Sequence, residues 1–319
     1  VAAAVSGDTV DMSQLACSTI SLRAGQIATA VDDLSIVGPG QDTLTIEAGS
    51  LSRIFYSTGN LSVSDLTIQL GAYYSPGGGC IRTIGDTSLT RVTAQFCDSG
   101  GYFNYHLHYP DSIQYPYQGG ALLVGGNLSL ASSTLFHSFA GHAGAANHRY
   151  LPDAPLAGGG AAYAHGNATV VDSTIDDVAI FSNLGPARGG ALQVHGNLIL
   201  TNSAITNSYT VGKEQVLYAS AGGAAFVDGT LTMEGSTIAG NCSSVDNVSY
   251  SGEAGGLFVG GSGSTILNST ITGNTAYRGG GIVAVDVTIG NSTIAFNGSV
   301  DGAGGAGLIV RGDSTIESS

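Results

Sequence analysis

Two segments of this chain gather side chains that could bind or transform a sugar. Residues 98–118 and 137–158 are rich in tyrosine and histidine and are interrupted by prolines. Tyrosine provides a large contact area at a low cost in conformational entropy, which suits both sugars and proteins as ligands. We therefore predict a binding surface for a glycan or a surface protein, made of Tyr102, Tyr105, Tyr109, Tyr115, Tyr117 and Tyr150.

The same segments, together with later ones, contain the groups that a polysaccharide lyase needs. Such an enzyme uses a cation to neutralise a uronate, and a base and an acid to move the proton. The candidates for these roles are His106, His108, His148, Arg149, Tyr150, Arg188 and Lys213. The Arg-x-Pro-x-x-Arg pattern of pectate lyases and the motifs of polygalacturonases are absent from the chain. We therefore favour a non-catalytic binding protein and keep a lyase as the alternative.

Other polar groups have structural explanations. Asp176 and Asp177 are adjacent acids of the kind that solvated turns contain. His165 and His195 each precede Gly-Asn, 30 residues apart. If that spacing is one structural repeat, their rings stack about 5 Å apart, the distance between neighbouring strands. No third ligand recurs with them, so we expect stacked turn residues and no metal site.

The four cysteines are Cys17, Cys80, Cys97 and Cys242. None of them has the CxxC spacing of a zinc or redox site. An even number in an exported chain permits two disulfides, in any of three pairings. The alternative is that they are buried free thiols.

Charge and composition exclude several classes of partner. The 319 residues include nine basic and 23 acidic ones, which gives a net charge of −14. Nucleic acids and anionic membrane surfaces attract arrays of Lys and Arg, so neither is expected as a partner. No cofactor is expected beyond a weak association of Ca²⁺ with the acidic surface, and no stretch is long enough for a transmembrane segment. The first residues, Val1 to Val5, resemble the product of signal-peptide removal, which predicts a secreted or outer-surface location.

A sequence repeat indicates which structural elements position these residues. Gly-Gly pairs recur at spacings that fall from 41 to 24 residues, and each is followed by three short alternating runs. Runs of this kind are strands with one buried face, and no helical period separates them. We therefore predict an all-β fold, a right-handed, single-stranded parallel β-helix with three short strands per coil. The residues beyond the minimal coil all fall between the third strand and the next Gly-Gly, so the insertions should collect at one corner.

The coils differ along the chain. We expect residues 1–16 to form an N-terminal cap and residues 17–319 a single β-helix domain. Its coils are less regular over 17–76 and are marked by Gly-Gly over 77–319. Asn241, Asn274 and Asn297 recur at one corner, where stacked Asn side chains satisfy turn backbone groups. No cap follows the last coil, so we expect either further coils or self-association through the ends of the solenoid.

Two sequence patterns carry a family resemblance. They are Asp33-Leu-Ser-Ile-Val-Gly-Pro-Gly-Gln-Asp-Thr-Leu-Thr-Ile46 and the repeated Gly-Gly-Gly-Ile and Asn-Ser-Thr-Ile-x-x-Asn units. The chain resembles the choice-of-anchor bacterial surface proteins and the β-helical passengers of autotransporters and polymorphic outer-membrane proteins. The resemblance implies a bacterial, adhesin-like or fibre-forming surface protein, and its motifs are structural.

Overall fold

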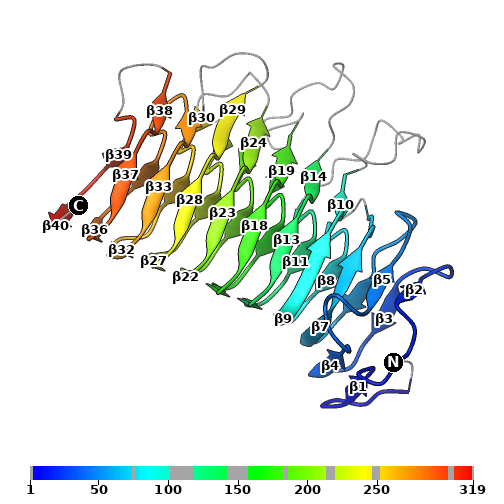
Figure 1. Ribbon diagram of the computed structural model, residues 1–319. Helices are drawn as coiled ribbons and strands as arrows, with labels where there is room; N and C mark the ends of the chain where they lie inside the picture. Colours follow the sequence, from blue (N-terminus) through cyan, green and yellow to red (C-terminus); the bar gives the residue numbers. More distant parts are fainter. Residues whose placement is uncertain are drawn as a thin grey trace.

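The computed structural model in Figure 1 describes residues 3–73, 77–100, 118–141, 157–182, 186–212, 220–245, 252–300 and 305–317. Every regular element in these ranges is a β-strand, and strands of successive coils pair in parallel along the whole stack. The chain is therefore all-β, with long parallel sheets that are consistent with a parallel β-helix. Among the described residues, no helix is long and apolar enough to cross a membrane.

Two large sheets form most of the stack. The ten-stranded sheet consists of β3 (Ile27–Thr29), β6 (Phe55–Ser57), β8 (Ile81–Thr83), β11 (Leu122–Val124), β16 (Ala162–Ala164), β21 (Leu192–Val194), β26 (Ala225–Val227), β31 (Leu257–Val259), β35 (Ile282–Ala284) and β39 (Leu308–Val310). The nineteen-stranded sheet has two rows that share the long strands β7 (Leu61–Gln69) and β9 (Thr87–Gln95). Its first row adds β1 (Thr9–Asp11), β4 (Leu34–Val37), β12 (Leu128–Ala131), β17 (Ala168–Val171), β22 (Leu198–Thr201), β27 (Leu231–Glu234), β32 (Ser264–Leu267), β36 (Val287–Gly290) and β40 (Ser314–Glu317). Its second row adds β2 (Thr19–Ser21), β5 (Thr45–Glu47), β13 (Thr134–Phe136), β18 (Thr174–Asp176), β23 (Ala204–Thr206), β28 (Thr237–Ala239), β33 (Thr270–Thr272) and β37 (Thr293–Ala295).

Two smaller sheets complete the coils. The seven-stranded sheet consists of β10 (Asp98–Ser99), β14 (Phe139–Gly141), β19 (Ala179–Phe181), β24 (Tyr209–Gly212), β29 (Cys242–Val245), β34 (Thr275–Ala276) and β38 (Gly298–Ser299). The four-stranded sheet consists of β15 (Ala157–Gly158), β20 (Ala187–Arg188), β25 (Ser220–Ala221) and β30 (Gly252–Glu253).

The predicted number of three strands per coil is wrong for the central coils. The coil from β15 to β19 has five strands, because the seven- and four-stranded sheets are added to the three expected runs. Several of their strands, such as β14 and β19, show no alternation of apolar and polar residues, and the backbone bonds to the neighbouring coils hold them in place. The predicted loops 98–118 and 137–158 therefore begin in strands β10 and β14, and the second also ends in β15.

Stacked aliphatic side chains fill the interior. One inward row runs through Leu130, Val170, Leu200, Met233 and Ile266, which lie in register on neighbouring strands and are at most 1% exposed. Along each strand such a buried residue alternates with a more exposed one, as Leu130 does with Ser129 and Val170 with Thr169, which is the pattern that predicted the strands. Burial of these rows along the whole stack provides the main driving force for folding.

The predicted asparagine ladder is present. The Oδ1 atom of Asn274 accepts hydrogen bonds from the backbone N–H of Asn241 (3.0 Å) and from its Nδ2 (2.9 Å). Asn297 repeats both contacts with Asn274, at 3.0 Å each. Asn241 and Asn274 are fully buried, so this ladder satisfies polar groups inside the stack.

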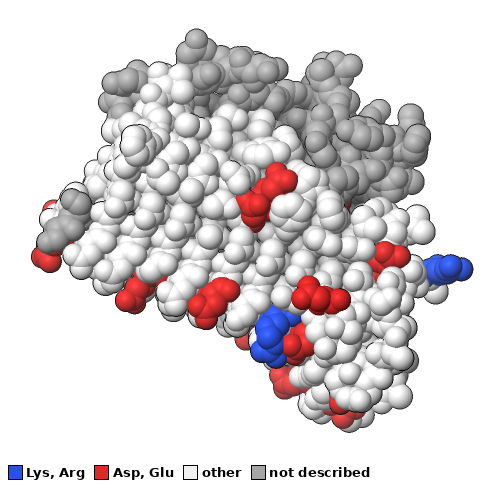
Figure 2. Space-filling view, viewed as in Figure 1, with Lys and Arg blue, Asp and Glu red and all other residues white. Residues whose placement is uncertain are grey.

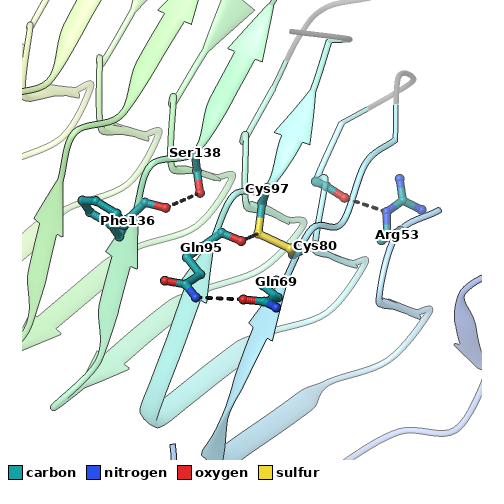
Figure 3. Close-up of a disulfide and its surroundings, with 8 residues drawn as sticks. Arg53, Gln69, Cys80, Gln95, Cys97, Phe136 and Ser138 are labelled. Atoms are coloured by element: carbon teal, nitrogen blue, oxygen red, sulfur yellow. Dashed lines mark hydrogen bonds between the residues drawn. A yellow bond between two sulfur atoms is a disulfide. The ribbon is translucent and has the colours of Figure 1, made fainter. Parts of the chain in front are cut away.

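The structure contains one disulfide. Cys80 and Cys97, both buried, are bonded with their Cα atoms 5.4 Å apart (Figure 3). Cys17 is exposed and Cys242 is half-buried, and neither forms a disulfide. Of the pairings that the sequence left open, only the one between Cys80 and Cys97 is realised.

Candidate functional site

Most of the predicted site residues lie outside the described residues. These are His106, His108, His148, Arg149, Lys213, Tyr102, Tyr105, Tyr109, Tyr115, Tyr117 and Tyr150, in the ranges 101–117, 142–156 and 213–219. Arg188 is described and ends β20. Each of these ranges follows a strand of the seven-stranded sheet. The next described residues belong to the four-stranded sheet or stand directly before a Gly-Gly pair. The described neighbours of these ranges therefore lie in these two sheets.

A row of side chains on one face of the ten-stranded sheet lies next to the four-stranded sheet. In register, the middle of this row is Leu123, Tyr163, Gln193, Phe226 and Phe258. The residues that alternate with them, such as Leu122 and Val194, belong to the main core, so this row faces the other way. Gly158 of β15 approaches it so closely that a Cβ atom there would overlap the Gln193 amide. This row, hereafter the floor, therefore lies against the four-stranded sheet and is largely covered, since Tyr163, Gln193 and Phe226 are at most 5% exposed.

Arginine side chains gather over the C-terminal part of this floor. A cavity of about 460 Å³, hereafter the arginine groove, is lined by Arg188, Ala221, Phe226, Glu253, Phe258, Arg278 and Arg311. The Phe226 and Phe258 rings are stacked, with centroids 4.7 Å apart and planes 3° apart. Arg188 Cζ lies 4.5 Å from the Phe226 centroid, a cation–π contact, and Arg311 Cζ lies 5.5 Å from that of Phe258.

The electrostatics of the groove differ from those of the whole chain. Three of the nine basic residues line it, against one acid, Glu253, among its described lining residues. Arg311 Nη2 donates to Glu253 Oε2 at 2.6 Å. Over the face shown in Figure 2, acidic side chains follow the lower edge and basic ones are few. The groove is therefore a local site for anions on an acidic protein.

A hydrogen-bonded chain of three side chains lies at the neighbouring part of the floor. The Tyr163 hydroxyl is 2.6 Å from His195 Nε2, and His195 Nδ1 is 2.7 Å from Asp228 Oδ2. Because the carboxylate of Asp228 accepts from Nδ1–H, Nε2 is left to accept from the tyrosine hydroxyl. Burial, with a smaller effect from the Asp228 charge, raises the pKa of Tyr163 to about 12. The tyrosine is therefore a protonated donor at neutral pH.

The predicted stack of the two histidines is confirmed. The His165 and His195 rings are parallel within 9°, with centroids 5.5 Å apart. Burial, and then the neighbouring His195, lower the pKa of His165 below its usual 6.5. Among the described residues, no group of three His, Cys, Asp or Glu could hold a metal ion. The hydrogen bond from Tyr163 to His195 could not be predicted, because Tyr163 lies inside a predicted strand.

This lowered pKa predicts a loss of stability in acid. The unfolded chain binds a proton at His165 near pH 6.5, whereas the folded chain does so only at lower pH. The free energy of unfolding should therefore fall as the pH drops through about 6.5. Replacing His165 by Asn should make thermal unfolding less dependent on pH in that window. An unchanged pH dependence in His165→Asn would contradict this assignment.

The adjacent acids Asp176 and Asp177 are engaged with neighbouring coils. Asp176 Oδ1 accepts hydrogen bonds from Thr206 Oγ1 (2.6 Å) and Asn207 Nδ2 (2.8 Å). Asp177 Oδ2 lies 2.6 Å from His137 Nδ1. These contacts join successive turns of the stack, in agreement with the structural explanation given to this pair.

Comparisons with known proteins give no family: no protein-family model, curated protein or solved structure matches the chain. The resemblance to bacterial surface proteins stays a prediction.

Proposed function

We propose that this protein is an exported or cell-surface, right-handed parallel β-helix that binds an acidic glycan in the arginine groove. The observation that carries this proposal is the gathering of Arg188, Arg278 and Arg311 around the stacked Phe226 and Phe258 rings in a chain of net charge −14. The right hand follows the rule that governs nearly all parallel crossover connections.

The chemistry of the groove suits a uronate or sulfated polymer. Guanidinium groups bind carboxylates and sulfates through paired, charge-assisted hydrogen bonds. The half-buried Phe258 ring offers apolar contact to the C–H face of a sugar. Arg188, Arg278 and Arg311 lie on different coils, so a linear polymer that runs along the stack can meet all three.

The disulfide supports the proposed location. Disulfides persist in oxidising compartments, and Cys80 and Cys97 are bonded in the interior of the fold. Secretion or exposure on the outer surface gives such a compartment and gives access to extracellular polysaccharides. The Tyr-rich segments 98–118 and 137–158 are proposed to add contacts to the same polymer.

Calorimetric titration with an acidic and a neutral polymer tests this proposal. We expect polygalacturonate to bind and a neutral galactan to show no heat of binding. Because the contacts are ionic and partly exposed, affinity for polygalacturonate should fall as salt is raised. Equal binding of the two polymers, or binding that salt does not alter, would overturn the proposal of an acidic ligand.

A further inference from the structure

We propose that a second groove, on the outer face of the nineteen-stranded sheet, binds an uncharged, extended β-1,4-linked glucan. This groove, hereafter the hydroxyl groove, is a cavity of about 380 Å³ that crosses four successive coils, those of β7, β9, β12 and β17. It shares no described lining residue with the arginine groove. A glucan bound there is a second ligand, independent of the acidic glycan proposed above.

Two rows of polar side chains line the hydroxyl groove. The row at the corner of the coils consists of Asn60, Asp86, Asn127 and Asn167, and the row on the strands consists of Ser62, Ser88, Ser129 and Thr169. Each corner side chain is fixed by the next coil. Asn60 Oδ1 accepts the backbone N–H of Asp86 (2.8 Å), Asp86 Oδ1 accepts that of Asn127 (2.7 Å), and Asn127 Oδ1 accepts that of Asn167 (2.9 Å).

The hydroxyl groups of the strand row are free to bind a ligand. Within the described part of the chain, none of these four hydroxyls has a hydrogen-bond partner, and each residue is exposed or half-buried. By contrast, the buried hydroxyls of Ser133, Ser173 and Ser203 each accept a backbone N–H from the preceding coil, at 3.0–3.1 Å. Those buried serines join the coils, so the strand row is not needed for that purpose. A hydroxyl both donates and accepts, as the hydroxyls of a sugar do.

The spacing of the strand row suits an extended glucan. Neighbouring strands lie about 4.8 Å apart. The rings of a β-1,4-linked glucan follow one another along the chain at a similar distance, so each coil can meet one ring. The row of hydroxyls ends at Ile199, which takes the next position in register and is 41% exposed. The hydroxyl groove therefore accommodates about four rings, one for each strand at that spacing.

The charge of the hydroxyl groove favours an uncharged ligand. Among the described residues that line it, Asp86 is the one ionisable group, and no arginine or lysine is present. The chain as a whole has a net charge of −14. An acidic polymer would meet a carboxylate and no cation in this groove, whereas a glucan has only hydroxyl groups to pair.

Calorimetric titration with cellotetraose and maltotetraose tests this proposal. The two tetrasaccharides have the same composition, but the α-1,4 linkages of maltotetraose curve its chain away from a straight groove. We expect cellotetraose to bind at least about 10-fold more tightly, because its rings alone can meet successive hydroxyls. A galactan should not follow the groove either, since its axial C4–O bonds turn the chain at each ring.

The test variant removes three of the free hydroxyls by combining Ser88→Ala, Ser129→Ala and Thr169→Val. The affinity for cellotetraose should fall about 10-fold or more, because three hydrogen bonds to the ligand are lost. The matched control combines Thr232→Val, Thr265→Val and Thr288→Val, which remove hydroxyls from the same register row beyond Ile199. The control should bind within about twofold of the wild type, and circular dichroism checks that both variants are folded.

Three results would overturn the proposal. The first is a failure of cellotetraose to bind, which leaves the binding of polygalacturonate to the arginine groove intact. The second is equal binding of the two tetrasaccharides, or an equal loss of affinity in the two triple variants. The third is a loss of cellotetraose binding when Arg188 and Arg311 are replaced by alanine, because the glucan would then lie in the arginine groove.

Discussion

Replacing Arg188 and Arg311 together by alanine is expected to weaken the binding of polygalacturonate by about 100-fold or more. A hydrogen bond to a charged group contributes about 1.5–3 kcal/mol, and two such contacts are lost. The change also leaves Glu253 without its Arg311 partner, so a carboxylate then faces the anionic ligand. Calorimetric titration of the variant against the wild-type protein measures the effect.

The control for this variant is Arg91→Ala combined with Arg23→Ala, which removes the same charge elsewhere. Arg91 is exposed and pairs with Asp65 on the nineteen-stranded sheet, away from the groove. This control should bind within about threefold of the wild type, because exposed charges at a distance are screened. Equal losses in the two variants would mean that overall charge, and not the groove, determines the affinity.

Replacing Asn274 by alanine is expected to lower the free energy of unfolding by about 4 kcal/mol. The side chain accepts two hydrogen bonds from Asn241 and donates to Ile238 O and Asn297 Oδ1, each at about 3.0 Å. Without it, two donors of the fully buried Asn241 lose their acceptor, and such groups are costly inside a protein.

Denaturant unfolding followed by circular dichroism measures this loss of stability. The control is Thr288→Ala, which removes an exposed side chain from β36 and should change the stability by no more than about 0.5 kcal/mol. If Asn274→Ala were as stable as the control, the asparagine ladder would make no contribution to the stability of the stack.

The parallel stack could be predicted because it depends on local, repeated signals. Ile205, Ile238 and Ile271 recur after the Gly-Gly marks and are buried in register. The same spacing predicted that His165 would stack on His195 and that Asn241 would bond to Asn274. In each case one repeat length determines which residues become neighbours.

The arginine groove could be predicted only in part in this way. Arg188 and Arg278 occupy equivalent places, each directly before its glycine pair, and they stand in one register row through Ala221 and Glu253. Arg311 follows strand β39, so no period connects it with the other two. Arg311 reaches from the last described coil back to Glu253, a separation of 58 residues. An alignment of the Gly-Gly units would have placed Tyr163, Gln193, Phe226 and Phe258 in one row. That row was the one signal of the floor in the sequence.

The disulfide also could not be predicted from the spacing of the repeats. Cys80 and Cys97 are only 17 residues apart, less than one coil, and they meet because the chain bends back within that coil. Spacing between coils says nothing of such a contact. Only the positions of the turns within the coil bring the two sulfur atoms together.

A crystal structure of the full chain with a bound uronate oligosaccharide tests the central claim most directly. We predict a sugar ring beside Phe258, with carboxylates next to Arg188, Arg278 and Arg311. An oligosaccharide bound only to residues 98–118 and 137–158, with the arginine groove empty, would contradict it.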